Sequence, residues 1–164
     1  MSGNIIPHAK LQMRYSFDNE YTPGQPEWPS AITPPDLSEY PEQQVIDSVM
    51  HWTKENPLDR NVLYNALGYV SSERLPEVLK DLFDVGGELT QASAVNAMKD
   101  QAFLEGVALR HTSPTVRMYA MTNITDPEIL KRLKENSKDE TVVRIASGKL
   151  DRIPKMPSGS GGAR

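Results

Sequence analysis

The chain has 164 residues, of which 38% are hydrophobic and 24% charged, and its formal net charge is −4 at neutral pH. That length accommodates one domain of ordinary size with extensions. It holds no cysteine, which excludes disulfides and thiolate metal sites and favours the cytoplasm. No apolar run approaches the roughly 20 residues that span a bilayer, and the first residues do not resemble a signal peptide. We therefore expect a cytoplasmic protein with no membrane partner.

The charge is unevenly distributed along the chain. Residues 1–41 carry 2 basic and 5 acidic side chains, residues 42–99 carry 5 and 9, and residues 100–164 carry 11 and 8. Such asymmetry can mark the place where an acidic partner or a polyanion docks, and a mixed solvated surface is the plain alternative.

Proline marks residues 1–41 as an extended arm, since 7 of the 13 prolines fall there. Between residues 10 and 18 apolar and polar side chains alternate strictly, which predicts a half-buried β-strand. Its apolar positions are Leu11, Met13, Tyr15 and Phe17. The prolines between residues 21 and 35 then favour extended, polyproline-like chain and forbid a regular helix.

This strand has no evident pairing partner elsewhere in the sequence, and an unpaired strand leaves its backbone N–H and C=O groups unsatisfied. Three outcomes are open: it adds to the sheet of another protein, it pairs with its copy in a homodimer, or it packs over the first helices as an irregular cap. Trp28 would help to seal apolar surface in such a cap, or would anchor an interface with a partner.

From residue 42 to 153 every segment has a helical pattern, and residues 154–164 form a flexible Gly/Ser-rich tail. The residues expected to begin helices are Pro41, Asp59, Ser72, Thr90, Asp100, Ser113, Asp126 and Asp139. We expect Pro57, Gly86 with Gly87, and Pro154 to end helices, with glycine supplying a left-handed residue. Four helix pairs, over about 42–70, 73–98, 100–124 and 126–150, predict an all-α domain.

Residues 100–150 repeat themselves at a fixed offset of 26 residues. The corresponding pairs include Asp100 with Asp126, Leu104 with Leu130, Thr115 with Thr141, Val116 with Val142, Ala120 with Ala146 and Ile124 with Leu150. These are apolar and helix-capping positions at helical spacing, so the repeating unit is a pair of short helices. Such units bury their core against neighbours and leave an extended surface for partners.

The pattern Thr115-Val116-Arg117 with Ala120 and Ile124, followed by Asp126-Pro127-Glu128-Ile129-Leu130, resembles HEAT-like repeats of the short variant type. The resemblance covers residues 100–153 well and residues 41–99 loosely. It implies a small right-handed α-solenoid, with Ala120 and Ala146 where paired helices come close and with the second helices lining a concave surface. The sequence departs from the family at Val143, where an arginine is frequent, and at Gly148, which either permits close packing or weakens the last helix.

No constellation of catalytic groups stands out. His8, His51 and His111 lie in the arm and in two different helix pairs, where surface or helix-capping roles are the plain interpretation. Common metal, nucleotide and nucleophile motifs do not occur. Some HEAT-like relatives are enzymes that act on DNA or on bilin pigments, but nothing in these residues supports either activity. We expect no enzymatic activity, no cofactor and no bound metal.

The expected function is binding, as an adaptor, assembly factor or inhibitor within a larger complex, with an arm that orders on a partner protein. The alternative is a nucleic-acid-binding protein with a basic groove in residues 110–152, against which the net negative charge of the chain stands. A solvated face with i,i+4 pairs, such as Glu128 with Arg132, is the plain interpretation of the same basic residues. The residues expected to contact a partner are Leu11, Met13, Tyr15, Phe17, Trp28, Arg117, Arg144, Lys149 and Arg152.

Overall fold

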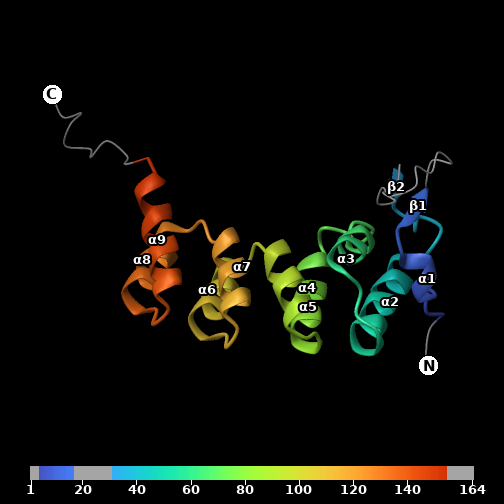
Figure 1. The fold of residues 1–164 in the computed structure, drawn as a ribbon, viewed down its shortest axis with the longest axis horizontal. Coiled ribbons are helices and arrows are strands. Elements are labelled where there is room, and N and C mark those ends of the chain that lie inside the picture. The colour runs from blue at the N-terminus through green and yellow to red at the C-terminus, as the bar shows by residue number, and fades with distance from the viewer. Residues whose placement is uncertain (1–3, 17–30, 155–164) are drawn as a thin grey trace, which may run out of the picture. The chain divides into compact units, whose positions relative to one another are not determined.

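The computed structural model describes residues 4–16 and 31–154, and these residues are mainly α-helical (Figure 1). In chain order the elements are α1 (His8–Leu11), β1 (Arg14–Ser16), β2 (Ala31–Thr33), α2 (Glu42–Glu55), α3 (Arg60–Leu67), α4 (Leu75–Val85), α5 (Glu88–Ala97), α6 (Gln101–Arg110), α7 (Pro114–Asn123), α8 (Pro127–Asn136) and α9 (Glu140–Arg152). The predominance of helix confirms the expected class, and both strands are only three residues long. None of the helices in the described ranges has the length and apolar character needed to cross a membrane.

Two compact units divide the chain, Met1–Thr90 and Gln91–Arg164. The first unit contains α1 to α4 and both strands, the second contains α6 to α9, and α5 includes the boundary. The division expected at residues 41 and 153 into arm, repeat domain and tail remains a prediction.

The predicted strand over residues 10–18 is wrong in its first half. Leu11 instead ends helix α1 with its side chain 1% exposed, and the chain is in a strand only from Arg14. β1 pairs antiparallel with β2 in the register Arg14 with Thr33, Tyr15 with Ile32 and Ser16 with Ala31. The expectation that the strand lacks a partner in its own chain is therefore also wrong. Three residues are too few to show the alternation that reveals a strand, so β2 left no periodic signal.

Helices α2, α3 and α4 provide the core of the first unit, and α2 packs against both of the others. Buried members of this core are Val45, Val49, Val62, Leu63, Leu79 and Leu82. Asp59 caps α3 as predicted, because its Oδ1 accepts the Val62 N–H at 3.0 Å. The cap predicted at Ser72 is wrong. The N–H groups of Arg74 and Leu75 both donate to Ser71 O, and this turn delays the start of α4 to Leu75.

Gly86 follows the last residue of α4, as predicted, but its role differs from the one expected. Its φ of −83° and ψ of 158° are extended and not left-handed. A Cβ at this position would lie 2.6 Å from the Thr90 side chain and 2.8 Å from Leu82 O. Glycine is therefore required because the first turn of α5 approaches the end of α4 closely.

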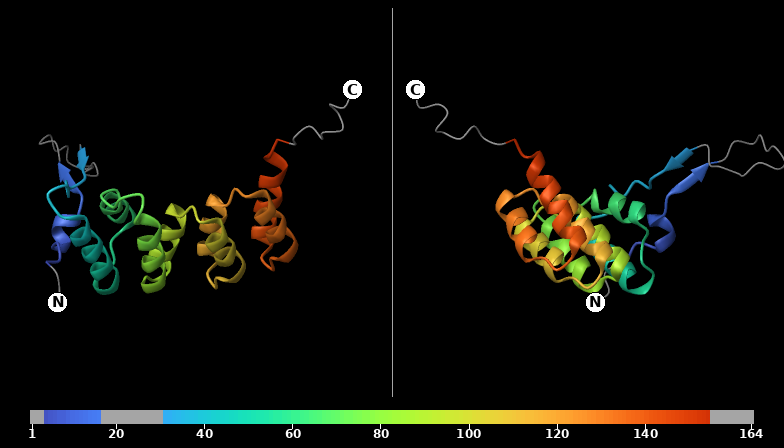
Figure 2. Two further views of the ribbon diagram at one scale, coloured as in Figure 1. Left: turned by 180° about the vertical axis from the view of Figure 1, so that it is seen from behind. Right: turned by 60° about the vertical axis from the view of Figure 1, so that its left-hand side comes forward.

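The second unit contains two helix pairs, α6–α7 and α8–α9, with α6 packed on α8 and α7 on α9 (Figures 1 and 2). The 26-residue offset holds in three dimensions, since α6 begins at Gln101 and α8 at Pro127, while α7 begins at Pro114 and α9 at Glu140. The side chains of Asp100, Ser113, Asp126 and Asp139 accept backbone N–H groups at the four helix starts, as predicted. Ala120 and Ala146 are both fully buried, and their position at the crossing of paired helices remains a prediction.

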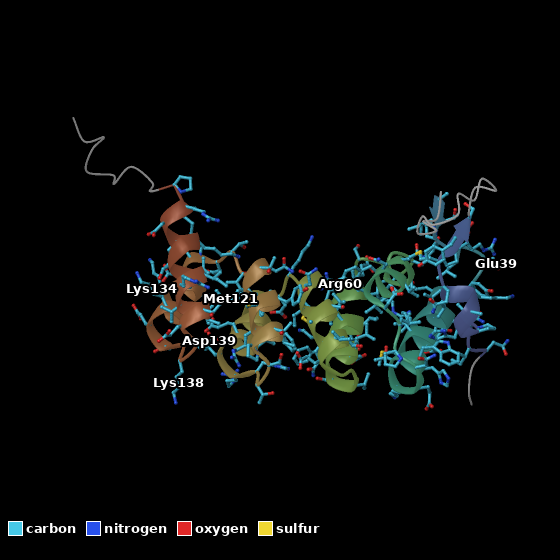
Figure 3. All side chains as sticks on the ribbon, in the orientation of Figure 1. Glu39, Arg60, Met121, Lys134, Lys138 and Asp139 are labelled. Carbon is cyan, nitrogen blue, oxygen red and sulfur yellow. The ribbon has the colours of Figure 1, made fainter. Side chains whose placement is uncertain are left out.

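Two features of α8 and α9 depart from a simple copy of the preceding pair. A Cβ added to Gly148 would meet nothing within 4 Å, so the interpretation that this glycine permits close packing is wrong. Lys134 is exposed and projects from α8 (Figure 3), whereas Ala108, the residue 26 positions earlier, is fully buried. The side of the pair that carries Lys134 is therefore suited to solvent.

Candidate partner-binding site

A hollow of about 360 Å³ lies over one face of the β1–β2 hairpin. Its lining residues are Met13, Tyr15, Ile32, Pro34, Asp59 and Asn61. Because Tyr15 pairs with Ile32 and side chains alternate along a strand, Met13 and Pro34 fall on the same face and complete an apolar floor. The start of α3 adds a polar wall. We name this feature the hairpin hollow.

The floor of the hairpin hollow is open to solvent, since Tyr15 is 57% exposed and Ile32 59% exposed. These two side chains are cross-strand neighbours, so they form one apolar patch. Apolar side chains that gather on a surface, with polar groups at the rim, are typical of binding sites.

The segment before the hairpin is fixed to α2. Ile6 is fully buried, its N–H donates to Ser48 Oγ at 2.8 Å, and its C=O accepts from Trp52 Nε1 at 2.8 Å. The His8 ring meets Trp52 edge-on with ring centroids 5.0 Å apart. Residues 4–11 therefore pack over α2 as a cap. The three outcomes left open from the sequence concerned the strand over residues 10–18, and the described part of that strand instead pairs with β2 of its own chain. Its addition to the sheet of another protein and its pairing in a homodimer remain predictions.

The predicted partner-binding residues of the arm have different environments in the structure. Met13 and Tyr15 come together in the hairpin hollow, while Leu11 is buried in the cap and is unavailable to a partner. Phe17 and Trp28 lie outside the described residues. Sequence reasoning missed Ile32, and the signal available was the β-branched pair Ile32-Thr33 directly before two prolines.

Arg117 serves the fold of the second unit and is only 18% exposed. Its Nε donates to Asp139 Oδ2 at 2.8 Å, and its Nη1 donates to His111 O at 2.6 Å and Thr112 O at 3.1 Å. The hydrogen bond from Arg117 holds the pKa of Asp139 below its ordinary value of 3.8, against the opposing effect of burial. These contacts join α7 to the loop before α9, so Arg117 is engaged within the protein and is not offered to a partner.

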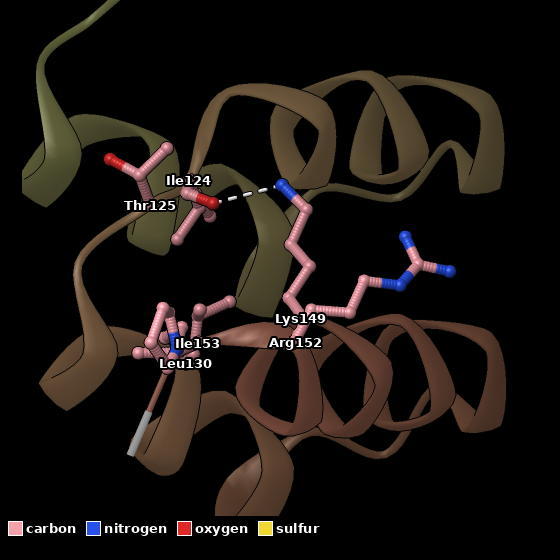
Figure 4. A pocket seen from close by; sticks show the side chains of 7 residues that line it. Ile124, Thr125, Leu130, Lys149, Arg152 and Ile153 are labelled. Carbon is pink, nitrogen blue, oxygen red and sulfur yellow. Dashed lines mark hydrogen bonds between the residues drawn. The ribbon is translucent and has the colours of Figure 1, made fainter. Parts of the chain in front are cut away.

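Lys149 also serves the fold, as a cap on the C-terminal end of α7 (Figure 4). Its Nζ donates to Thr122 O at 3.0 Å, to Ile124 O at 2.9 Å and to Met121 O. An ammonium group has three N–H donors, so these contacts use its full capacity, and a cation is favoured at a helix C-terminus. Partial burial lowers the pKa of Lys149.

The residue 26 positions before Lys149 makes the equivalent contact. Asn123 Nδ2 donates to Val95 O at 3.2 Å and to Asn96 O, at the C-terminal end of α5. The repeat therefore includes a polar capping position that is filled by an amide in one copy and by an ammonium in the next. Sequence comparison missed this equivalence because the two side chains share no chemistry beyond their N–H donors.

Arg144 and Arg152 are exposed on α9, so two of the four predicted basic residues remain on the surface. They are eight positions apart on one helix, which separates them by about 80° around its axis. They belong to the second unit, whereas the hairpin hollow belongs to the first.

The histidines do not assemble a reactive centre in the described part of the chain. His111 Nδ1 accepts the Ser113 N–H at 3.0 Å in the turn between α6 and α7, and His51 meets Trp52 edge-on. Among residues 4–16 and 31–154, no group of three His, Asp or Glu side chains is arranged to hold a metal ion.

Comparisons with known proteins do not add a relative. No protein-family model matches the chain, no curated protein matches it, and no solved structure matches its fold. The chain is a mainly α-helical protein.

Proposed function

We propose that this chain is a protein-binding module, an adaptor, assembly factor or inhibitor that works without catalysis and captures another protein at the hairpin hollow. The observation that carries the proposal is the exposed pair Tyr15 and Ile32, held in place by a buried anchor at Ile6. A two-stranded hairpin is marginally stable by itself, so fixing it to α2 prepares the apolar pair for contact.

A partner that binds here would gain free energy by covering apolar surface. Burying a large apolar side chain that is otherwise exposed is worth about 1.5–3 kcal/mol, and both Tyr15 and Ile32 are more than half exposed. Aromatic side chains in particular act as anchors at protein interfaces. At the rim, the Asp59 carboxylate can accept hydrogen bonds from a bound backbone, and the Asn61 amide can both donate and accept them.

The proposal includes the finer architecture that the HEAT-like resemblance implies. A right-handed solenoid of about four helix pairs in the cytoplasm would present the helices as an extended surface beside the arm. The 26-residue offset between corresponding helices of the two pairs in the second unit supports this part of the proposal.

Nucleic-acid binding is less well supported. Arg117 and Lys149 use their N–H donors within the protein, which leaves Arg144 and Arg152 as the predicted basic residues on the surface. A salt titration with a short DNA or RNA duplex tests this alternative, because phosphate binding weakens steeply with ionic strength.

The test of the proposed function is affinity capture with the purified full chain from a lysate of its source cells, followed by mass spectrometry. The double variant Tyr15→Ala with Ile32→Ala should lose the partner that the wild type captures. Met118→Ala is the matched control, since Met118 is also exposed, at 49%, but lies on α7. Equal capture by the double variant, or no partner specific to the wild type, contradicts the proposal.

A further inference from the structure

Two adjoining hollows lie at the C-terminal ends of α5, α7 and α9 in the second unit. The first, of about 380 Å³, lies between the ends of α5 and α7 and includes Met98, Lys99 and Asn123 in its lining. The second, of about 310 Å³, lies between the ends of α7 and α9 and includes Ile124, Lys149 and Arg152. Thr125 lines both of them. We name the two together the paired hollows.

The paired hollows are successive copies of one feature of the repeat. Met98 and Ile124 are 26 residues apart, and so are Asn123 and Lys149. Asn123 on α7 caps the C-terminal end of α5, and Lys149 on α9 caps the C-terminal end of α7, in both cases by donating to backbone carbonyl groups. A ligand that follows the stack of helices therefore meets the same kind of site twice.

The chemistry of the lining defines the charge of the ligand. Lys99, Lys149 and Arg152 are cationic, and no acidic side chain is among the residues that line either hollow. Lys99 and Arg152 are exposed, so their charged head groups can contact a ligand directly. The Lys149 ammonium is bonded to backbone carbonyl groups and contributes only its positive charge. Of the acids next to lining residues in the sequence, Asp100 and Asp126 are engaged as helix caps, while Asp151 is exposed on α9.

Apolar groups form the floor of the second hollow, and they favour a peptide over a nucleic acid as the ligand. Ile124, Leu130, Ile153 and Pro154 line it, with Arg152 at its edge (Figure 4). No aromatic ring is among the residues that line the paired hollows, so nothing there could stack on a base. Aliphatic side chains next to carboxylates fit this combination of surfaces better than bases and phosphates do.

Spacing sets the conformation of the ligand. Packed helices lie about 8–10 Å apart. A polyproline II segment has three residues per turn and advances about 3.1 Å per residue, so residues three positions apart lie on one side, about 9 Å from each other. We propose that the paired hollows bind an acidic segment of a partner protein in the polyproline II conformation, with aliphatic side chains three residues apart entering the two hollows and carboxylates facing Lys99 and Arg152. The proposal takes from the proposed function only that the ligand is a protein, and it uses a surface other than the hairpin hollow.

A selection from a displayed library of random octapeptides on the full-length chain tests the proposal. It should enrich acidic peptides with aliphatic residues at a spacing of three. Fluorescence anisotropy with an enriched peptide should then show at least tenfold weaker binding for Lys99→Glu and for Arg152→Glu. Arg144→Glu is the matched control, since Arg144 is exposed on α9 but lines neither hollow, and it should change binding less than threefold. Circular dichroism confirms that each charge-reversed variant is folded.

Several results would overturn this inference. Enrichment of basic or purely apolar peptides, or no enrichment, contradicts the charge argument. An equal loss of peptide binding in Arg144→Glu contradicts the assignment of the binding site to the paired hollows. Tighter binding of a single-stranded oligonucleotide than of the acidic peptide contradicts the assignment of the ligand as a peptide. The variant Tyr15→Ala with Ile32→Ala should bind the peptide normally, so failure of the hairpin proposal and failure of this one are distinguishable.

Discussion

Two glycines should respond to alanine in opposite directions. Gly148 lies inside α9, and its added Cβ would meet no atom within 4 Å. Alanine therefore brings only its helix propensity, which is worth about 1 kcal/mol relative to glycine. At Gly86 the added Cβ would lie 2.6 Å from Thr90 Cβ and 2.8 Å from Leu82 O. Neither atom is the free end of a flexible side chain, so backbone must move, at a cost of about 1–3 kcal/mol.

Thermal unfolding followed by circular dichroism measures both effects as shifts in melting temperature. The slope of a urea transition checks that only the stability changes. Gly148→Ala should stabilise its unit and raise its melting temperature by about 4–8 °C, the shift expected for 1 kcal/mol in a unit of this size. Gly86→Ala should lower the stability of the first unit. A destabilised Gly148→Ala would refute the open space beside α9, and an unchanged Gly86→Ala would refute the close approach of Thr90.

Other expectations concern buried contacts in both units. Ala120→Leu should cost about 1–3 kcal/mol in chemical denaturation, because Ala120 is fully buried, and an unchanged midpoint contradicts the helix crossing. Arg117→Ala should cost about 1.5–3 kcal/mol and should couple to Asp139→Ala in a double-mutant cycle, whereas additive effects contradict the pairing. The pKa of Asp139 is lowered by Arg117, so this stability is complete above the ordinary value of 3.8 and is lost as pH falls through the lowered one. Arg117→Ala should therefore flatten the acid side of the stability profile. Trp52→Phe removes the hydrogen bond to Ile6 O and should cost about 0.5–1.5 kcal/mol of stability. Amide hydrogen exchange at Ile6 should become faster, and unchanged exchange contradicts the anchoring of Ile6 on α2.

The helices could be predicted from the sequence because their signals are local. Asp100, Ser113, Asp126 and Asp139 each precede an apolar pattern of period 3.6, and capping depends only on residues two or three positions away. The prediction that Ser72 caps a helix is wrong because a separate turn precedes that helix. Hydrogen bonds to Ser71 O close this turn and delay the start of α4 to Leu75. Local rules are reliable here until a neighbouring turn competes for the same backbone groups.

The hairpin hollow could be predicted only in part because it depends on contacts across long sequence separations. The alternation at Met13 and Tyr15 correctly placed both on one face, but their partners Ile32 and Asp59 come from segments with no pattern that links them to β1. The basic residues show the same limit. Charge alone does not distinguish Arg152 on the surface from Lys149, whose ammonium is occupied by carbonyl groups 25 or more residues away.

Amide hydrogen exchange on the captured complex, compared with the free chain, tests the central claim most directly. Binding at the hairpin hollow predicts slower exchange at residues 14–16, residues 31–33 and the first turn of α3, with no change at the buried Ile6 amide. Protection confined to other helices, with exchange at both strands unchanged, would contradict the assignment of this face to partner binding.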